Sequence, residues 1–246
     1  MLDSINLGKY IWGKSLIHKL HAVCKVLSLL MMIISIFFID SYVDIIILTI
    51  YLFLGILYTG INIKVYLKNV FSIKIFILFV FIIDLVFFDS INRIIFDLFK
   101  LLFIVLYASL LTFTTTVMEI TFGIEKILIP FSKIIPVRDI ASIVTLTLRY
   151  IPLLNNEASR IIRAQKFRGI DFKSKNVRKK IEMISVVFVP IFTLSLERAD
   201  KTADIMDLRL YNYSKSRTNY RQKKWRAIDT CLLILNIWIL IIVIIY

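Results

Sequence analysis

Residues 160–226 read RIIRAQKFRGIDFKSKNVRKKIEMISVVFVPIFTLSLERADKTADIMDLRLYNYSKSRTNYRQKKWR and carry most of the positive charge of the chain. This basic segment holds 18 of the 31 Lys and Arg residues but 6 of the 17 Asp and Glu residues, a net charge of +12 out of +14. Apolar runs flank it on both sides. Because Lys and Arg accumulate in the cytoplasmic loops of membrane proteins, the segment predicts a large cytoplasmic region between membrane-spanning helices.

The overall composition is that of an integral membrane protein. Of the 246 residues, 59% are hydrophobic, which is more apolar surface than a soluble domain of this size can bury, so the excess must face lipid. In a soluble chain the net charge would indicate nucleic-acid binding, but membrane insertion explains it more simply. Cys24 and Cys231 form no CxxC pattern and are interpreted as apolar packing residues.

Five apolar runs predict membrane crossings, and the charges between them predict the topology. The connections before the first run and after the second are basic, whereas those after the first and third are acidic or neutral. The N-terminus is therefore expected inside, and four crossings return the chain to the cytoplasm near Met118. Lys100 is the exception and is assigned to an outer helix end, where its stem can reach the interface. The runs are roughly residues 26–39, 45–61, 75–88, 101–118 and 231–246.

Two long helices are predicted in the cytoplasmic part, over residues 137–167 and about 176–208. Both are apolar at first and charged later, which favours helices that start in the membrane interface and extend into the cytoplasm. Each contains one proline, Pro152 or Pro190, which removes a backbone hydrogen bond and should bend the helix. Helices of about thirty residues span roughly 45 Å, enough to reach well past the membrane.

These elements predict an all-α, polytopic membrane protein with about five transmembrane helices and two long cytoplasmic helices. Residues 1–118 form an N-terminal membrane domain with four spans, residues 119–227 a cytoplasmic region, and residues 228–246 a C-terminal transmembrane helix. The abundance of Ile and Lys is typical of an AT-rich bacterial genome. The predicted location is the bacterial cytoplasmic membrane, which the chain would cross several times with its N-terminus inside.

The sequence contains no catalytic or metal-binding constellation. His18 and His21 could share a helix face, but no Cys or carboxylate follows at metal-ligand spacing, so a polar start to the first span is preferred. The sequence has neither a GxxxxGK[ST] phosphate loop nor a GxSxG motif, so we do not expect the chain to hydrolyse ATP or to be an enzyme. Asp84, in the third apolar run, indicates a functional group, an interhelical partner or simply a position at the interface.

Two blocks near the ends of the long helices carry the most specific signal. Their centres are Phe167, Arg168 and Gly169 in the first and Leu208, Arg209 and Leu210 in the second. Both blocks closely resemble the arginine-centred coupling motifs of the EcfT/CbiQ-type transmembrane subunit of energy-coupling-factor (ECF) transporters, the membrane scaffold of a class of micronutrient importers. That family typically places small residues around each arginine, as in Ala-Arg-Gly, whereas bulkier neighbours stand here. The full blocks comprise Glu157, Arg160, residues 163–172, residues 195–200, residues 206–211, Arg217, Thr218, Tyr220 and Arg221.

The resemblance extends over most of the chain. Residues that look like the family's N-terminal pattern are Tyr10, Gly13, Ser15, His18, Leu20 and Lys25. Residues that look like its fourth span are Leu111, Thr112, residues 114–116, Met118 and Glu119. Residues 148–153, LRYIPL, look like its first coupling helix.

The resemblance implies that the two long cytoplasmic helices are coupling helices. Arg168 and Arg209, with their neighbours, would each dock in a groove on one of two cytoplasmic ABC ATPase subunits, and the membrane helices would hold a separate membrane protein that binds the substrate, a vitamin or a metal ion. The chain itself would bind no cofactor or metal, and the partner subunits would use ATP. A guanidinium suits docking, because it offers a rigid fork of hydrogen-bond donors and stays charged when partly desolvated.

Other protein classes fit the sequence less well. A conventional ABC permease, the main alternative, would use one short cytoplasmic coupling helix, often with a Glu-Ala-Ala-Gly-type segment that is absent from the sequence. A membrane enzyme acting on lipids or prenyl groups would need paired carboxylates or a metal cluster near the interface. A pore-forming or structural protein would not need two arginine blocks. The transported substrate is not predictable from this chain, because in this family the partner protein selects it.

Overall fold

The computed structural model describes residues 10–13, 15–87, 90–170, 177–211 and 223–245. By its internal contacts the chain divides into two compact units. The first comprises Asn6–Ala141 and Gln222–Tyr246, and the second is built on Ser142–Arg221. Every regular element in the described ranges is a helix, which confirms the all-α prediction.

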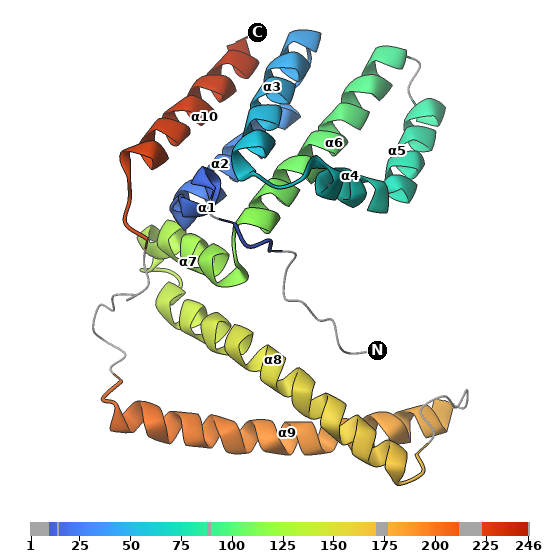
Figure 1. Ribbon diagram of the computed structural model, residues 1–246, viewed down its shortest axis with the longest axis vertical. Helices are drawn as coiled ribbons and strands as arrows, with labels where there is room; N and C mark the ends of the chain where they lie inside the picture. The colour runs from blue at the N-terminus through green and yellow to red at the C-terminus, as the bar shows by residue number, and fades with distance from the viewer. Residues whose placement is uncertain (1–9, 14, 88–89, 171–176, 212–222, 246) are drawn as a thin grey trace. The chain divides into compact units, whose positions relative to one another are not determined.

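Three helices of the first unit are long and apolar enough to cross a membrane: α3 (Tyr42–Thr59), α6 (Ile91–Thr114) and α10 (Ala227–Ile245) (Figure 1). α4 (Ile63–Ser72) and α5 (Lys74–Phe87) meet at an angle of 56° and meet the same criterion as a pair, so the described residues hold three or four candidate spans. α2 (Ala22–Phe37) is apolar but has 16 residues, fewer than the roughly 20 of a usual crossing. The chain is thus a polytopic membrane protein, and the number of five spans stays a prediction.

α2 occupies the centre of the first unit, where it packs against α6, α10 and α7 (Val117–Leu128). Met32 and Ile36 of α2 belong to one buried core with Leu48 of α3 and Phe113 of α6, all at most 2% exposed. The Tyr107 hydroxyl of α6 donates to the Leu48 carbonyl at 3.0 Å. An unpaired polar group inside a membrane costs several kcal/mol, so this bond lets tyrosine occupy the core.

Local capping chemistry sets where several helices begin and end. Ser41 with Asp44 at the start of α3, and Thr116 with Glu119 at the start of α7, form capping boxes in which each side chain accepts from the other residue's backbone N–H. Gly60 ends α3 with φ 67°, a left-handed conformation that glycine adopts without strain. The remaining short elements of the first unit are α1 (Leu16–Lys19) and the 3₁₀ turn η1 (Ile129–Phe131).

The fourth apolar run was placed too late in the sequence. α6 begins at Ile91, and Arg93, Asp97 and Lys100 lie within it, so Lys100 is not at an outer helix end as predicted. These charges follow one another at helical spacing, which places them on one side of the helix rather than in a loop. A search for uninterrupted apolar residues cannot detect such a helix start. The run also ends too late, because Thr115 and Thr116 separate α6 from α7.

The basic connection expected before the third run is also helical. Lys64 and Lys68 lie on α4, an amphipathic helix, and Lys74 is the first residue of α5. The Ser72 hydroxyl donates to the Lys68 carbonyl at 2.9 Å, a local bond of the kind that bends helices. The chain therefore turns at this point with neither Gly nor Pro.

The second unit is dominated by α8 (Val137–Phe167) and α9 (Val177–Leu208), whose bounds agree with the two predicted long helices within one residue. Both continue through their internal prolines, Pro152 and Pro190, and the bends expected there stay predictions. The two compact units divide near residues 141 and 221, whereas the sequence placed its boundaries at 118 and 227. α7 belongs to the first unit because it packs against α2. Where the membrane boundary lies along the chain stays a prediction.

Candidate docking ends of the long helices

The last turn of α8 places Arg168 at the helix C-cap. The Gly169 N–H donates to the Lys166 carbonyl at 3.0 Å, and the Ile170 N–H donates to the Gln165 carbonyl at 3.1 Å. This pair of bonds is a Schellman motif, which satisfies the final carbonyls of a helix and requires a left-handed residue just beyond the cap. Gly169 has φ 89° and occupies that position without strain.

The last turn of α9 has the same architecture around Arg209. The Leu210 N–H donates to the Asp207 carbonyl at 2.9 Å, and the Tyr211 N–H donates to the Met206 carbonyl at 3.0 Å. Leu210 takes the left-handed position with φ 54° and is the only non-glycine residue in the described ranges with a positive φ. An L-residue in this conformation costs roughly 1–2 kcal/mol. The two arginines are therefore held by equivalent backbone motifs, although one motif lacks glycine.

The residues beside the two arginines are apolar and almost fully exposed. Phe167 is 91% exposed, and Leu208 and Leu210 are 84% and 89% exposed. Arg168 and Arg209 are exposed as well, and neither forms an ion pair with another residue that the structure describes. Each helix therefore ends in a cation next to at least one unburied apolar side chain, a combination typical of binding surfaces.

Two side-chain contacts join α8 to α9 where the helices cross (Figure 1). The Arg198 guanidinium of α9 donates to the Glu157 carboxylate of α8, with side-chain exposures of 30% and 17%. Near this ion pair the hydroxyls of Tyr150 and Thr202 hydrogen-bond at 2.8 Å. Both contacts lie between residues far apart in the sequence, so each restrains the angle between the helices.

The Glu157–Arg198 contact is equally distant in sequence from the two helix ends. Arg168 follows Glu157 by 11 residues, and Arg209 follows Arg198 by 11 residues. At 1.5 Å per residue, each arginine lies about 16 Å of helix beyond the crossing. The two helix ends therefore extend equally far beyond the Glu157–Arg198 ion pair. The sequence blocks contained Glu157 and Arg198, but no sequence signal predicted that they pair.

Neighbouring charges on α9 form a second, exposed ion pair. The Lys201 ammonium donates to the Glu197 carboxylate at 2.6 Å across one helical turn. This hydrogen bond and the adjacent positive charge lower the pKa of Glu197 below its ordinary value. The pair lies within one helix, so it cannot restrain the crossing.

The apolar halves of both long helices remain largely uncovered. On α8, Ile143 and Leu153 are 63% and 42% exposed, and on α9, Phe188 and Phe192 are 62% and 53% exposed. The two phenylalanine rings stack with their centroids 6.0 Å apart. No residue in the described ranges covers most of these apolar faces, so they are available to contact a membrane protein or lipid.

A polar cluster in the first unit joins the N-terminal pattern to the residues that precede α10. The Lys223 ammonium contacts the Glu119 carboxylate at 2.6 Å and donates to the His18 carbonyl at 2.8 Å. Lys25, only 5% exposed, donates to the Thr114 carbonyl at 2.9 Å. The residues that the sequence assigned to separate family patterns are therefore brought together. The Thr116–Glu119 capping box, a recognisable T-x-x-E pattern, is the signal that sequence reasoning missed.

Asp229 anchors the start of α10 to the start of α2. Its carboxylate accepts the His21 N–H at 2.9 Å and the Arg226 N–H at 2.8 Å, and it is 1% exposed. The Cys24 thiol donates to the Asp229 carbonyl at 3.3 Å, so Cys24 packs as predicted in a buried position. Burial lowers the pKa of His21, and the negative charge of Asp229 partly opposes that shift.

His18 has a structural role in the N-terminal segment. Its Nε2–H donates to the Ile11 carbonyl at 3.0 Å, so Nδ1 is the acceptor for the Ser15 hydroxyl at 2.6 Å. A Cβ at Gly13 would lie 2.7 Å from the His18 ring, which explains the glycine. Both ring nitrogens are thus engaged with protein atoms.

Other predicted residues have no assigned role or lie outside the described ranges. Asp84 of α5 is 6% exposed, and its Oδ2 has no hydrogen-bond partner among the residues described. The block residues that lie outside the described ranges are Asp171, Phe172, Arg217, Thr218, Tyr220 and Arg221.

Comparison with known proteins finds relatives over nearly the whole chain. The model of the family described as cobalt transport protein, CbiQ, matches residues 13–220. The energy-coupling factor transporter transmembrane protein EcfT of Ruminiclostridium cellulolyticum is 33% identical over 245 residues, covering 93% of this chain and 92% of the relative. The protein of the same name from Lactococcus lactis subsp. cremoris is 31% identical over an alignment of 262 residues, covering 99% and 98%. That of Bacillus subtilis is 29% identical over 251 residues, covering 95% of each chain.

Proposed function

The chain belongs to the CbiQ family of transporter transmembrane proteins, and we propose that it is the coupling subunit of an ECF-type ABC importer. As a membrane component of such a transporter, it would transmit the motion of two cytoplasmic ATPase subunits to a separate substrate-binding membrane protein. The cargo would be a vitamin or a metal ion. The observation that carries this proposal is the pair of equivalent helix ends, each with an exposed arginine at a Schellman C-cap.

Docking on the ATPases would use two kinds of interaction at each end. The guanidinium would donate to carboxylates or backbone carbonyls in a groove of the partner, in bonds about twice as strong as those between neutral groups. The apolar neighbours, Phe167 on α8 and Leu208 and Leu210 on α9, would be buried against the rim of that groove. Because these neighbours differ between the two ends, the two ends would fit grooves of different shape.

Transmission would depend on the contact between α8 and α9. When ATP closes the ATPase pair, the two arginine ends would move relative to each other, and the Glu157–Arg198 contact would convert that displacement into a change of helix angle. The uncovered apolar faces of both helices would then slide against the substrate-binding protein and reorient it. In this proposal ATP is bound and hydrolysed by the partners, and this chain contributes no catalytic group.

The proposal is tested by neutralising the two arginines in the assembled transporter. Arg168→Ala and Arg209→Ala should each weaken co-purification of the ATPase subunits, and the double variant should abolish uptake while still inserting in the membrane. Lys201→Ala is the control, since Lys201 is an exposed cation of α9 that lies outside both arginine blocks. If the double variant retains the ATPases as well as the wild type does, the assignment is wrong.

A further inference from the structure

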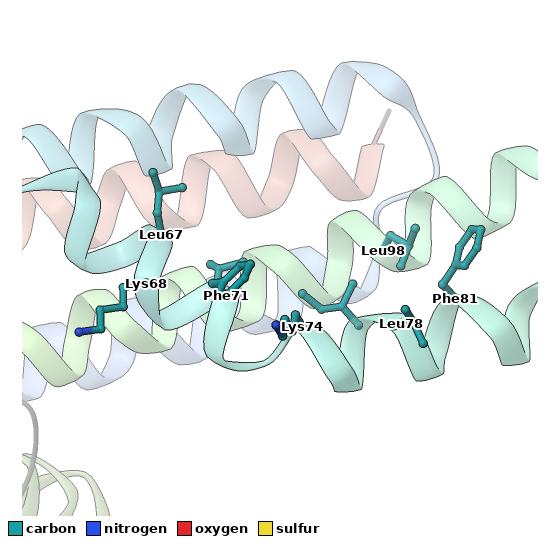
Figure 2. A pocket seen from close by; sticks show the side chains of 9 residues that line it. Leu67, Lys68, Phe71, Lys74, Leu78, Phe81 and Leu98 are labelled. Carbon is teal, nitrogen blue, oxygen red and sulfur yellow. The ribbon is translucent and has the colours of Figure 1, made fainter.

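An open groove of about 670 Å³ lies on the first unit, between the bent α4–α5 pair and α6 (Figure 2). Its walls are almost entirely apolar, and Phe71, Leu78, Phe81 and Leu98 contribute side chains from the three helices. The volume is in the range of sites that hold small ligands. Leu78 and Phe71 are 59% and 67% exposed, so molecules outside the first unit can reach the groove.

The groove is charged at one end only. Figure 2 shows Lys74 at the bend between α4 and α5 and Lys68 about one turn earlier on α4, whereas Phe81 and Leu98 lie farther along α5 and α6. The Lys74 ammonium is 4.4 Å from the centroid of the Phe71 ring, a cation–π contact that holds it beside the apolar wall. Neither lysine is paired with a carboxylate in the part of the chain that the structure describes.

We infer that this groove binds one phospholipid with an anionic headgroup. The two ammonium groups would hold the headgroup phosphate at the bend, and an acyl chain would extend along α5 and α6 toward Phe81 and Leu98. The charge argues for this occupant: a purely apolar protein segment would leave both lysines unpaired, and a zwitterionic headgroup would offset them with its own cation. The predicted topology places the bend on the cytoplasmic side, where lysines near the surface attract anionic lipids.

The bend itself produces the geometry that a lipid needs. In a straight helix, Lys68 and Phe81 would lie along one axis and no concave surface would form between them. The 56° angle between α4 and α5 opens a concave surface against α6. Lysine stems can lie along apolar surface while the ammonium stays at the interface, so the charged end and the apolar wall are compatible. The groove thus has a headgroup end and an acyl-chain end in one continuous surface.

The test is lipid binding by the full chain in detergent, followed by native mass spectrometry. The probes are dioleoyl phosphatidylglycerol and dioleoyl phosphatidylcholine, which share acyl chains and differ in headgroup charge. Wild type should retain one phosphatidylglycerol more tightly than phosphatidylcholine. Lys68→Gln/Lys74→Gln should bind phosphatidylglycerol about 30-fold more weakly, at about 1 kcal/mol per lysine. Lys64→Gln, which changes an exposed lysine of α4 that does not line the groove, should bind like the wild type.

A second arm distinguishes the groove from a general electrostatic effect. Leu78→Trp should fill the groove and weaken both lipids while leaving the two lysines in place. Equal binding of the two lipids by wild type, undiminished binding in the double lysine variant, or the same loss in Lys64→Gln would overturn the inference. So would a photo-crosslink in cells from Leu98→p-benzoylphenylalanine that joins the chain to a polypeptide rather than to lipid.

Discussion

Breaking the Glu157–Arg198 ion pair should loosen the crossing of α8 and α9 by a predictable amount. The pair is partly buried, with side-chain exposures of 17% for Glu157 and 30% for Arg198, so its strength lies between two known limits. Exposed ion pairs contribute about 0.2–1 kcal/mol, and removing one partner of a buried pair costs about 3–5 kcal/mol. We therefore expect each single variant, Glu157→Gln or Arg198→Gln, to cost about 2 kcal/mol, with a coupling energy of about 1–2 kcal/mol.

The contact geometry explains why the coupling should not be larger. One carboxylate oxygen of Glu157 receives the guanidinium, while its Oε2 and the Arg198 Nη1 have no partner among the described residues. The pair is thus joined through one donor and one acceptor atom and lacks the second bond of a bidentate arrangement. Two buried polar atoms without partners offset part of the electrostatic gain.

The assay is hydrogen–deuterium exchange of the full chain, read on peptides around residues 150–160 and 195–205. A cost of about 2 kcal/mol corresponds to roughly 30-fold faster exchange in each single variant. The double variant should be less destabilised than the sum of the two singles, because its second substitution removes a charge that is already unpaired. Glu197→Gln is the control, since its exposed partner Lys201 lies on the same helix and should not affect α8. Strictly additive single effects would refute the reasoning.

Three further perturbations follow from the described contacts. Leu210→Gly should relieve the left-handed strain of roughly 1–2 kcal/mol, and part of this gain is offset because glycine has more conformational entropy in the unfolded chain. We expect slower amide exchange at the end of α9. Faster exchange there would contradict the prediction. Asp229→Ala removes two hydrogen bonds to a buried carboxylate, each worth about 1.5–3 kcal/mol. This variant should lower the thermal unfolding midpoint in detergent, and Asp229→Asn should lower it by less. Because burial lowers the pKa of His21 below its ordinary 6.5, the folded state binds fewer protons, and stability should fall as the pH drops below that value. The same titration of His21→Gln should show a smaller loss; an unchanged acid loss would exclude His21 as its source.

Much of the helical architecture was predictable because its signals are local. Gly169 ends the first long helix, and in both helices the change from apolar to charged residues repeats at helical spacing, so both were placed within one residue. The three central residues of each arginine block are contiguous in sequence, and the resemblance of the blocks to known coupling motifs agrees with the family matches over most of the chain. Hydrophobic content alone was enough to predict a membrane protein.

Helix starts that carry charge were not predictable from apolar runs. α6 begins with Arg93, Asp97 and Lys100 inside its first turns, and α4 carries Lys64 and Lys68. A charged residue ends an apolar run in the sequence but does not end a helix. The backbone continues to hydrogen-bond as long as such side chains can reach water, the interface or a partner.

Composition and local periodicity by themselves determined that this chain is a helical membrane protein that contains two long helices. Only the tertiary structure decided which distant residues meet: Glu157 with Arg198, Lys223 with Glu119, and Asp229 with the backbone of His21. The structure also showed that a leucine occupies the left-handed cap position of α9, although the hydrogen bonds of that cap are local. The physical reason is that helix formation depends on neighbours within one or two turns, whereas a long-range ion pair or hydrogen bond depends on which surfaces the packed helices bring together.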